Sequence, residues 1–283
     1  MSQDKINSLI FMLVVLFSVL VGGVRRGGPD EIALESRTEK TALTAAASNA
    51  ITETVAPPVA PPAISAAAAV VKDLYNLEPI YALNPAQQWP VASITKLMTA
   101  AVAMDKMPAE ERITVSQAAV ATEGGAGNLI VGQSYSRDEL LSVLLVVSSN
   151  DAAAALAEHH GQENFIEAMN ERAVALGMYN TRFFDPTGLS PLNQSMAGDL
   201  EKLVKYIFHV RPEIFALTRQ KEGNIHPFVG RENFIGGKTG FIDEASGNLI
   251  SLFNHNGRPL LIIVLGSEDR AKDTELLYNV FAQ

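Results

Sequence analysis

Cysteine is absent from this chain of 283 residues. Its absence excludes disulfides, lipid attachment through cysteine and thiolate metal sites. Histidine is scarce, with five residues, and none of them belongs to a His-Glu-x-x-His metal-binding pattern. Lysine and arginine total 22 against 31 acidic residues, so the net charge is −9, and the basic residues form no run. This balance argues against a nucleic-acid partner, and the sequence implies neither a metal ion nor an organic cofactor.

The beginning of the chain is strongly apolar. The run from Ile6 to Val24 follows Lys5 and precedes two arginines. Residues 1–26 are therefore either a cleaved secretory signal or an uncleaved membrane anchor. The length of the run and the lack of an Ala-x-Ala site favour the anchor, and both alternatives place the rest of the chain outside the cytoplasm.

A tract rich in alanine and proline comes next. Residues 27–64 contain Ala, Thr, Ser and Glu and then the pairs Pro57-Pro58 and Pro61-Pro62. Such a composition cannot bury a core, and proline stiffens it. We expect a disordered linker at 27–64, followed by one folded domain at 65–283.

Within that domain, strand patterns lie at both ends and helix patterns lie between them. Strands are expected at 69–75, 79–83, 234–241, 249–254 and 259–266, and helices at 91–104, 140–147, 152–160, 163–176, 196–210 and 272–281. The prediction is an α/β fold in which one antiparallel sheet is built from both ends and flanked by helices. An all-helical subdomain is inserted between them, and the active site lies in the cleft.

Two polar residues interrupt the apolar helix expected at 91–104. Ser93 and Lys96 are three positions apart, so they share one face of a helix. A serine hydroxyl becomes a nucleophile when a nearby base takes its proton, and a buried lysine beside a second cation is such a base. A polar notch in a core helix is the alternative interpretation.

Two further polar clusters follow in order, Ser148-x-Asn150 and Lys238-Thr239-Gly240. With Ser93-x-x-Lys96 they form the trio of motifs found in penicillin-binding proteins and serine β-lactamases. The chain resembles the low-molecular-mass penicillin-binding proteins of the D-alanyl-D-alanine carboxypeptidase family, from about Ser65 to Gln283. Further segments that carry the resemblance are 90–99, 150–153, 186–190, 193–200 and 237–241.

The resemblance implies a serine peptidase that acts on peptidoglycan stem peptides and is acylated by β-lactams. Ser93 would form an acyl-enzyme, and Lys96 would act as its base, with a pKa lowered by the charge of Lys238. Ser148 would pass a proton to the leaving amine. The protein would reside in the periplasm or on the outer face of the cytoplasmic membrane of a bacterium, held by residues 1–26 if these are uncleaved.

The same resemblance assigns the substrate-binding residues. Asn150 would bind the amide backbone of the substrate, while Lys238 and Thr239 would bind its terminal carboxylate. Gly240 would leave room for the peptide to lie along the strand edge. The backbone N–H groups of Ser93 and Phe241 would form the oxyanion hole.

Several alternatives stay open. Asn150 fits a helix cap and Lys238 an ordinary strand-end lysine, while Asp185 and Asp199 fit loop and capping positions. A β-lactamase shares the trio, but the stretch 184–189 contains no glutamate to activate water. A non-catalytic binder of penicillin or peptidoglycan is the third possibility. The sequence leaves no room for the extra β-rich domain that some members carry, and carboxypeptidase and endopeptidase activity both remain open.

Two departures from the family pattern bear on specificity. The segment 224–231, just before the third motif, fits the pattern poorly, and Ile242 occupies a position where threonine is common. Substrate preference is expected to differ there.

Overall fold

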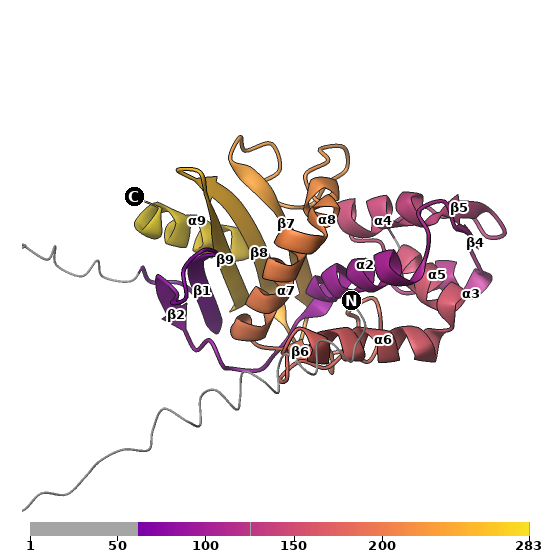
Figure 1. Cartoon of the computed structure of the whole chain (residues 1–283), viewed down its shortest axis with the longest axis horizontal. Helices are drawn as coiled ribbons and strands as arrows, with labels where there is room; N and C mark the ends of the chain where they lie inside the picture. The colour runs from indigo at the N-terminus through magenta and orange to yellow at the C-terminus, as the bar shows by residue number, and fades with distance from the viewer. Residues whose placement is uncertain (1–61, 125, 283) are drawn as a thin grey trace, which may run out of the picture. The chain divides into compact units, whose positions relative to one another are not determined.

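A computed structural model describes residues 62–124 and 126–282 (Figure 1). The expected signal or anchor at 1–26 lies outside the described residues, as does nearly all of the expected linker at 27–64. Among the described helices, none has the length and apolar character needed to cross a bilayer.

A five-stranded antiparallel sheet is the centre of the described domain. Its strands are β1 (Ala68–Asp73), β2 (Tyr81–Leu83), β7 (Phe234–Ile242), β8 (Ser246–His255) and β9 (Arg258–Ser267). They are arranged in the order β2-β1-β9-β8-β7, so the first strand pairs with the last. The expected antiparallel sheet built from both ends of the domain is thereby confirmed. Asn256 and Gly257, both at positive φ, form the tight turn between β8 and β9.

Helices cover both faces of the sheet. Helix α9 (Arg270–Phe281) packs on one face, where Phe253, Ile262 and Leu277 belong to one apolar cluster. The other face carries α7 (Ala197–Val210) and α8 (Pro212–Leu217), and its residues join the larger core. Strand β7 is left as an edge strand on the side nearest the helical part of the domain (Figure 1).

The helical part lies between β2 and β7 in the sequence, as expected. It contains α2 (Thr95–Lys106), α3 (Gln117–Val120), α4 (Arg137–Val146), α5 (Asn150–His160) and α6 (Gln162–Ala175). Helix α4 begins at a capping box, in which Ser136 and Glu139 each accept the other's backbone N–H. Two short antiparallel pairs complete it: β3 (Trp89–Pro90) with β6 (Gln194–Ser195), and β4 (Arg112–Thr114) with β5 (Ser134–Ser136).

Two expectations for the helices were wrong in detail. The helix expected at 91–104 does not begin at Val91, because Trp89–Pro90 is a strand and Ala92 has a φ of 49°, which no α-helix accommodates. A 3₁₀ turn, η1 (Ala92–Ile94), comes first, and α2 follows it. Helix α8 was not expected at all, although Pro212 suits the first position of a helix.

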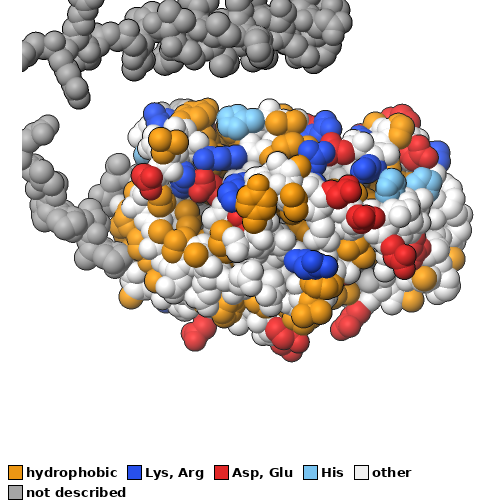
Figure 2. All heavy atoms as spheres, turned by 60° about the horizontal axis from the view of Figure 1, so that its bottom comes forward, with side chains coloured by type: hydrophobic (Ala, Val, Ile, Leu, Met, Phe, Trp, Pro, Cys, Tyr) orange, Lys and Arg blue, Asp and Glu red, His pale blue; other side chains and the backbone are white. Residues whose placement is uncertain are grey.

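The surface is of mixed charge. On the face drawn in Figure 2, Lys and Arg side chains lie interspersed with Asp and Glu, and this face has no continuous basic patch.

Candidate active site

Ser93 lies in the tight turn η1, where the chain passes from strand β3 into α2. This turn is fixed from three sides. Asn248 donates a hydrogen bond to the Pro90 carbonyl at 2.8 Å, and the Val91 N–H donates to the Asn193 carbonyl at 2.9 Å. From the third side, a Cβ on Gly188 would lie 2.0 Å from the Ala92 oxygen, so only glycine permits this approach. The half-buried Ser93 hydroxyl is therefore held at a defined position.

Lys96 is fully buried one turn further along. Its Nζ lies 3.0 Å from Ser93 Oγ, 2.6 Å from Asn150 Oδ1 and 2.6 Å from the Thr187 carbonyl oxygen. Burial lowers the pKa of Lys96 from 10.5 to about 7, although the charges of Asp185 and Asp151 act in the opposite direction. A large fraction of Lys96 is therefore neutral near pH 7. Burial, which was expected to act together with a second cation, is the main cause of this shift.

The Thr187 carbonyl is positioned by a loop that one carboxylate organises. Asp185 accepts hydrogen bonds from the backbone N–H groups of Thr187, Gly188 and Ser190, at 2.7 to 2.8 Å. Thr99 of α2 also donates to the Pro186 carbonyl at 2.6 Å, which ties the loop to the Ser93–Lys96 helix. Asp185 thus acts within the loop, as the sequence suggested.

The second motif occupies the junction between α4 and α5. Ser148 has a φ of 61°, and Ser149 caps α5 by accepting the Ala152 N–H at 2.9 Å. Because Ser149 is the cap, the interpretation of Asn150 as a helix cap was wrong. The Asn150 amide instead bridges Lys96 and the Glu123 carbonyl, to which it donates at 2.7 Å. Asn150 therefore orients Lys96 while being fixed itself.

The third motif lies in the middle of β7. Lys238 is buried, and its Nζ donates to Ser148 Oγ at 2.8 Å and to the Thr239 carbonyl at 3.0 Å. Burial lowers the pKa of Lys238 well below its ordinary value, and the charges of Lys96 and Arg270 lower it further. Ser148 thus contacts Lys238, whereas no hydrogen bond joins it to Ser93 or Lys96 in the described structure. The structure nevertheless brings all three motifs together, since Asn150 contacts Lys96 and Ser148 contacts Lys238.

The free edge of β7 presents backbone groups to that cleft. The Gly237 N–H points away from β8, since it donates to Thr218 Oγ1 at 3.1 Å. N–H groups alternate in direction along a strand, so those of Thr239 and Phe241 point to the same free edge. A Cβ on Gly240 would lie 2.8 Å from the Val91 oxygen, which explains the glycine next to the Ser93 turn. Phe241 is 60% exposed at the mouth of the cleft.

Sequence reasoning missed three contributors to this site. Thr187 acts through its carbonyl, Asn193 supports the Ser93 turn, and Thr218 receives the Gly237 N–H. Backbone acceptors leave no mark in side-chain patterns, so the Thr187 contact has no sequence signal. Among residues 62–124 and 126–282, no three His, Asp or Glu side chains gather so as to hold a metal ion.

The sequence of this chain was compared with those of known families and proteins. Residues 52–269 match the family described as D-alanyl-D-alanine carboxypeptidase. The chain is 35% identical over 224 residues to the D-alanyl-D-alanine endopeptidase of Escherichia coli K12, covering 72% of each chain. It is 30% identical to the carboxypeptidase DacC of the same organism, covering 77% of this chain and 60% of DacC.

Solved structures agree with the sequence relatives. Penicillin-binding protein 6B of Escherichia coli matches with a TM-score of 0.70 and 29% identity, over 78% of each chain. The Streptomyces K15 DD-transpeptidase matches with a TM-score of 0.73 and 25% identity, over 78% of this chain and 98% of that one. This chain belongs to the D-alanyl-D-alanine carboxypeptidase family.

Proposed function

We propose that Ser93 is the nucleophile and Lys96 the general base of a D-alanyl-D-alanine peptidase. The family acts on peptidoglycan peptides and binds β-lactams, and this member is a serine hydrolase. The observation that carries the assignment is the 3.0 Å contact between Ser93 Oγ and the buried Nζ of Lys96. A lysine in that position with a pKa of about 7 is suited to take the hydroxyl proton near neutral pH.

The reaction follows from the positions of these groups. Neutral Lys96 takes the Ser93 proton while Oγ attacks the carbonyl carbon of the D-alanyl peptide bond. The N–H groups of Ser93 and Phe241 bind the oxyanion, each contributing roughly 3 to 4 kcal/mol. Ser148 passes the proton that Lys96 has taken to the leaving nitrogen, and the C–N bond breaks to leave an ester on Ser93 and a neutral Lys96. Water then attacks the ester carbonyl while Lys96 takes the water proton and returns it to Ser93 Oγ, which releases the acyl peptide as a carboxylic acid and restores the Ser93 hydroxyl.

The substrate is positioned along β7. Thr239 and Lys238 bind the carboxylate next to the scissile bond, and Asn150 binds the amide of the acyl side. The peptide lies against the free edge of the strand as an added strand, for which the N–H groups of Thr239 and Phe241 are available. Gly240 permits this edge to approach the Ser93 turn.

Among the two peptidase activities, we propose cleavage of cross-links. Three relatives named D-alanyl-D-alanine endopeptidase are 34 to 36% identical to this chain, whereas the relatives named DacA, DacC and DacD carboxypeptidases are 30 to 31% identical. We further propose that the protein is exported, to the periplasm or the outer cytoplasmic membrane surface. Mass spectrometry of the mature N-terminus distinguishes a cleaved signal from an anchor at 1–26.

The decisive experiment is incubation of the full chain with a penicillin, followed by intact mass over time. One lasting adduct is expected on the unchanged protein and on the matched control Ser134→Ala, and none on Ser93→Ala. Rapid loss of penicillin without an adduct would indicate a β-lactamase, and unchanged penicillin would indicate a non-catalytic protein. Either outcome overturns the proposal.

A further inference from the structure

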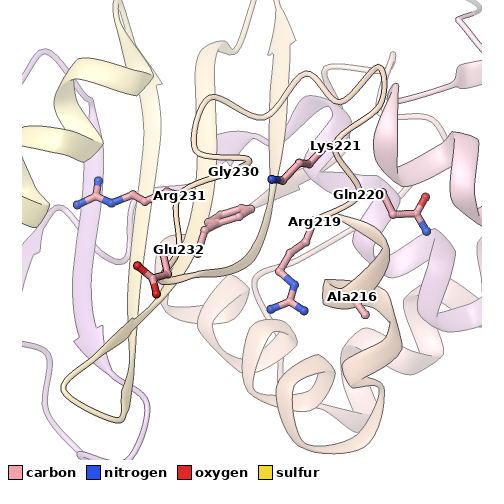
Figure 3. Close-up of a pocket in the computed structure, with 8 residues that line it drawn as sticks. Ala216, Arg219, Gln220, Lys221, Gly230, Arg231 and Glu232 are labelled. Carbon is pink, nitrogen blue, oxygen red and sulfur yellow. The ribbon is translucent and has the colours of Figure 1, made fainter.

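A hollow of about 400 Å³ lies at the beginning of strand β7, outside the motifs described above. It is lined by the segment after α8 and by the segment that enters β7. Figure 3 shows Arg219 and Lys221 on one side of the opening and Arg231 and Glu232 on the other. The hollow adjoins the stretch 224–231, which departs from the family pattern.

The direction of a bound peptide follows from two points on β7. The scissile carbonyl lies at the Phe241 N–H, and the carboxylate that follows it lies at Thr239 and Lys238. The peptide therefore runs antiparallel to β7, with its leaving side toward the beginning of the strand. Residues rise about 3.3 Å each along a strand, so Phe234 lies roughly 13 Å beyond Lys238 in that direction.

The edge available for backbone pairing ends at Gly237. Its N–H already donates to Thr218, so a peptide cannot pair with β7 beyond this point. Two contacts hold the segment that follows Thr218 against α4, and a third closes the segment on itself. Ser142 of α4 donates to Gln220 at 3.0 Å, Asn224 donates to the Thr218 carbonyl at 2.9 Å, and the Ile225 N–H bonds the Val146 carbonyl. Arg219 and Lys221 line the same hollow as Phe234, so they lie beyond the point at which backbone pairing with β7 ends.

The basic side chains at the hollow differ in whether they form ion pairs. Arg231 forms an ion pair with Glu275 at 3.0 Å, and its guanidinium lies 4.2 Å from the centre of the Tyr278 ring. Arg219 and Lys221 are exposed, and neither forms an ion pair with any carboxylate of the described residues. Glu232 also lines the hollow, but in a chain with an acidic balance two exposed cations that form no ion pair favour an acidic ligand.

We propose that Arg219 and Lys221 bind carboxylates of the leaving strand when a cross-linked peptide is cleaved. The inference rests on the proposed peptidase function, and it names the two residues that favour cross-linked peptides as substrates. A leaving D-alanine ends at the carboxylate held by Thr239 and does not reach the hollow. The leaving half of a cross-linked dimer continues past this carboxylate as a second acidic stem peptide, and its further carboxylates reach the two cations.

The test compares two substrates in one pair of variants. Arg219→Ser/Lys221→Ser removes the two charges, and Lys106→Ser/Lys272→Ser is a matched control that removes two exposed charges elsewhere. We expect kcat/KM for a cross-linked peptide dimer to fall about fivefold to tenfold in the first variant only. Cleavage of a monomeric pentapeptide and acylation by penicillin should stay unchanged, and 0.5 M salt should reduce the difference between the variants.

Three results would overturn the inference. The first is an equal fall for dimer and monomer, the second is no fall for the dimer, and the third is absence of dimer cleavage in a protein that penicillin acylates. Loss of penicillin acylation in the unchanged protein would instead contradict the proposed function itself. Charge reversal by Arg219→Glu/Lys221→Glu should enlarge the effect on the dimer, which separates charge from a local change in packing.

Discussion

In the proposed mechanism, in which Lys96 is the base, its pKa determines how the rate of acylation depends on pH. With a pKa of about 7, half of Lys96 is neutral at pH 7, which is roughly a thousandfold more than for an ordinary lysine. The neutral form is the base, so lowering the pH protonates it. We therefore expect the second-order rate constant for penicillin acylation to be flat above pH 8 and to fall about tenfold per pH unit below 6.5.

Asn150→Asp perturbs this equilibrium directly. It places a carboxylate where the amide oxygen now lies 2.6 Å from Lys96 Nζ. An opposite charge at this distance should raise the pKa of Lys96 by roughly 1 to 3 units. At pH 7 the neutral fraction of Lys96, and with it the rate constant, should then fall by roughly 5- to 500-fold, and raising the pH should restore much of it.

The assay is the rate of adduct formation by intact mass between pH 5.5 and 9.5. Asn150→Ala is the matched variant, because it removes the same hydrogen bond without adding charge. The midpoint of the pH–rate profile of Asn150→Ala should stay near 7 or move lower, while the midpoint for Asn150→Asp should move higher. A wild-type rate that is constant between pH 6 and 8, or an Asn150→Asp midpoint at or below the wild-type value, would refute the reasoning.

Two further predictions concern stability. Burial lowers the pKa of His226 to about 3, so below pH 6.5 the unfolded chain binds a proton that the folded chain excludes. The free energy of unfolding is therefore highest above pH 6.5, and about 3 kcal/mol of it should be lost by pH 4. In urea unfolding, His226→Gln should lose this pH dependence and the exposed control His209→Gln should keep it; equal slopes would contradict the prediction. Gly188→Ala should cost roughly 2 to 4 kcal/mol and slow acylation, because its Cβ would collide with the Ala92 carbonyl. Gly132→Ala, also at positive φ but with open space around it, should cost less and acylate normally, and thermal unfolding with the penicillin assay compares the two.

Much of this fold follows from local sequence patterns. The strands β8 and β9 were predicted because their patterns are local, and the Asn256-Gly257 turn that joins them likewise depends only on residues near one another. The capping box of α4 is equally local. The resemblance of the three motifs to the family pattern predicted which side chains would meet.

The features of the site that the sequence did not predict depend on tertiary contacts. The positive φ of Ala92 and the approach of Gly188 set the Ser93 turn, and no periodicity encodes either one. The contact between Lys238 and Ser148 likewise depends on how closely β7 lies to the junction between α4 and α5. The burial of His226 depends on the missing side chain of Gly237, whose Cβ would lie 2.6 Å from the imidazole Nε2.

The pairing of β1 with β9 determines when the sheet can be completed during synthesis. Val70 pairs with Ile263, so β9, the inner neighbour of β1, is synthesised last of the five strands in the sheet. At about 5 to 20 residues per second, roughly 190 residues separate the two partners by about 10 to 40 seconds. During that interval the apolar β1 has only the three-residue β2 beside it. The complete sheet, with β9 between β1 and β8, can therefore form only after Arg258–Ser267 has been synthesised.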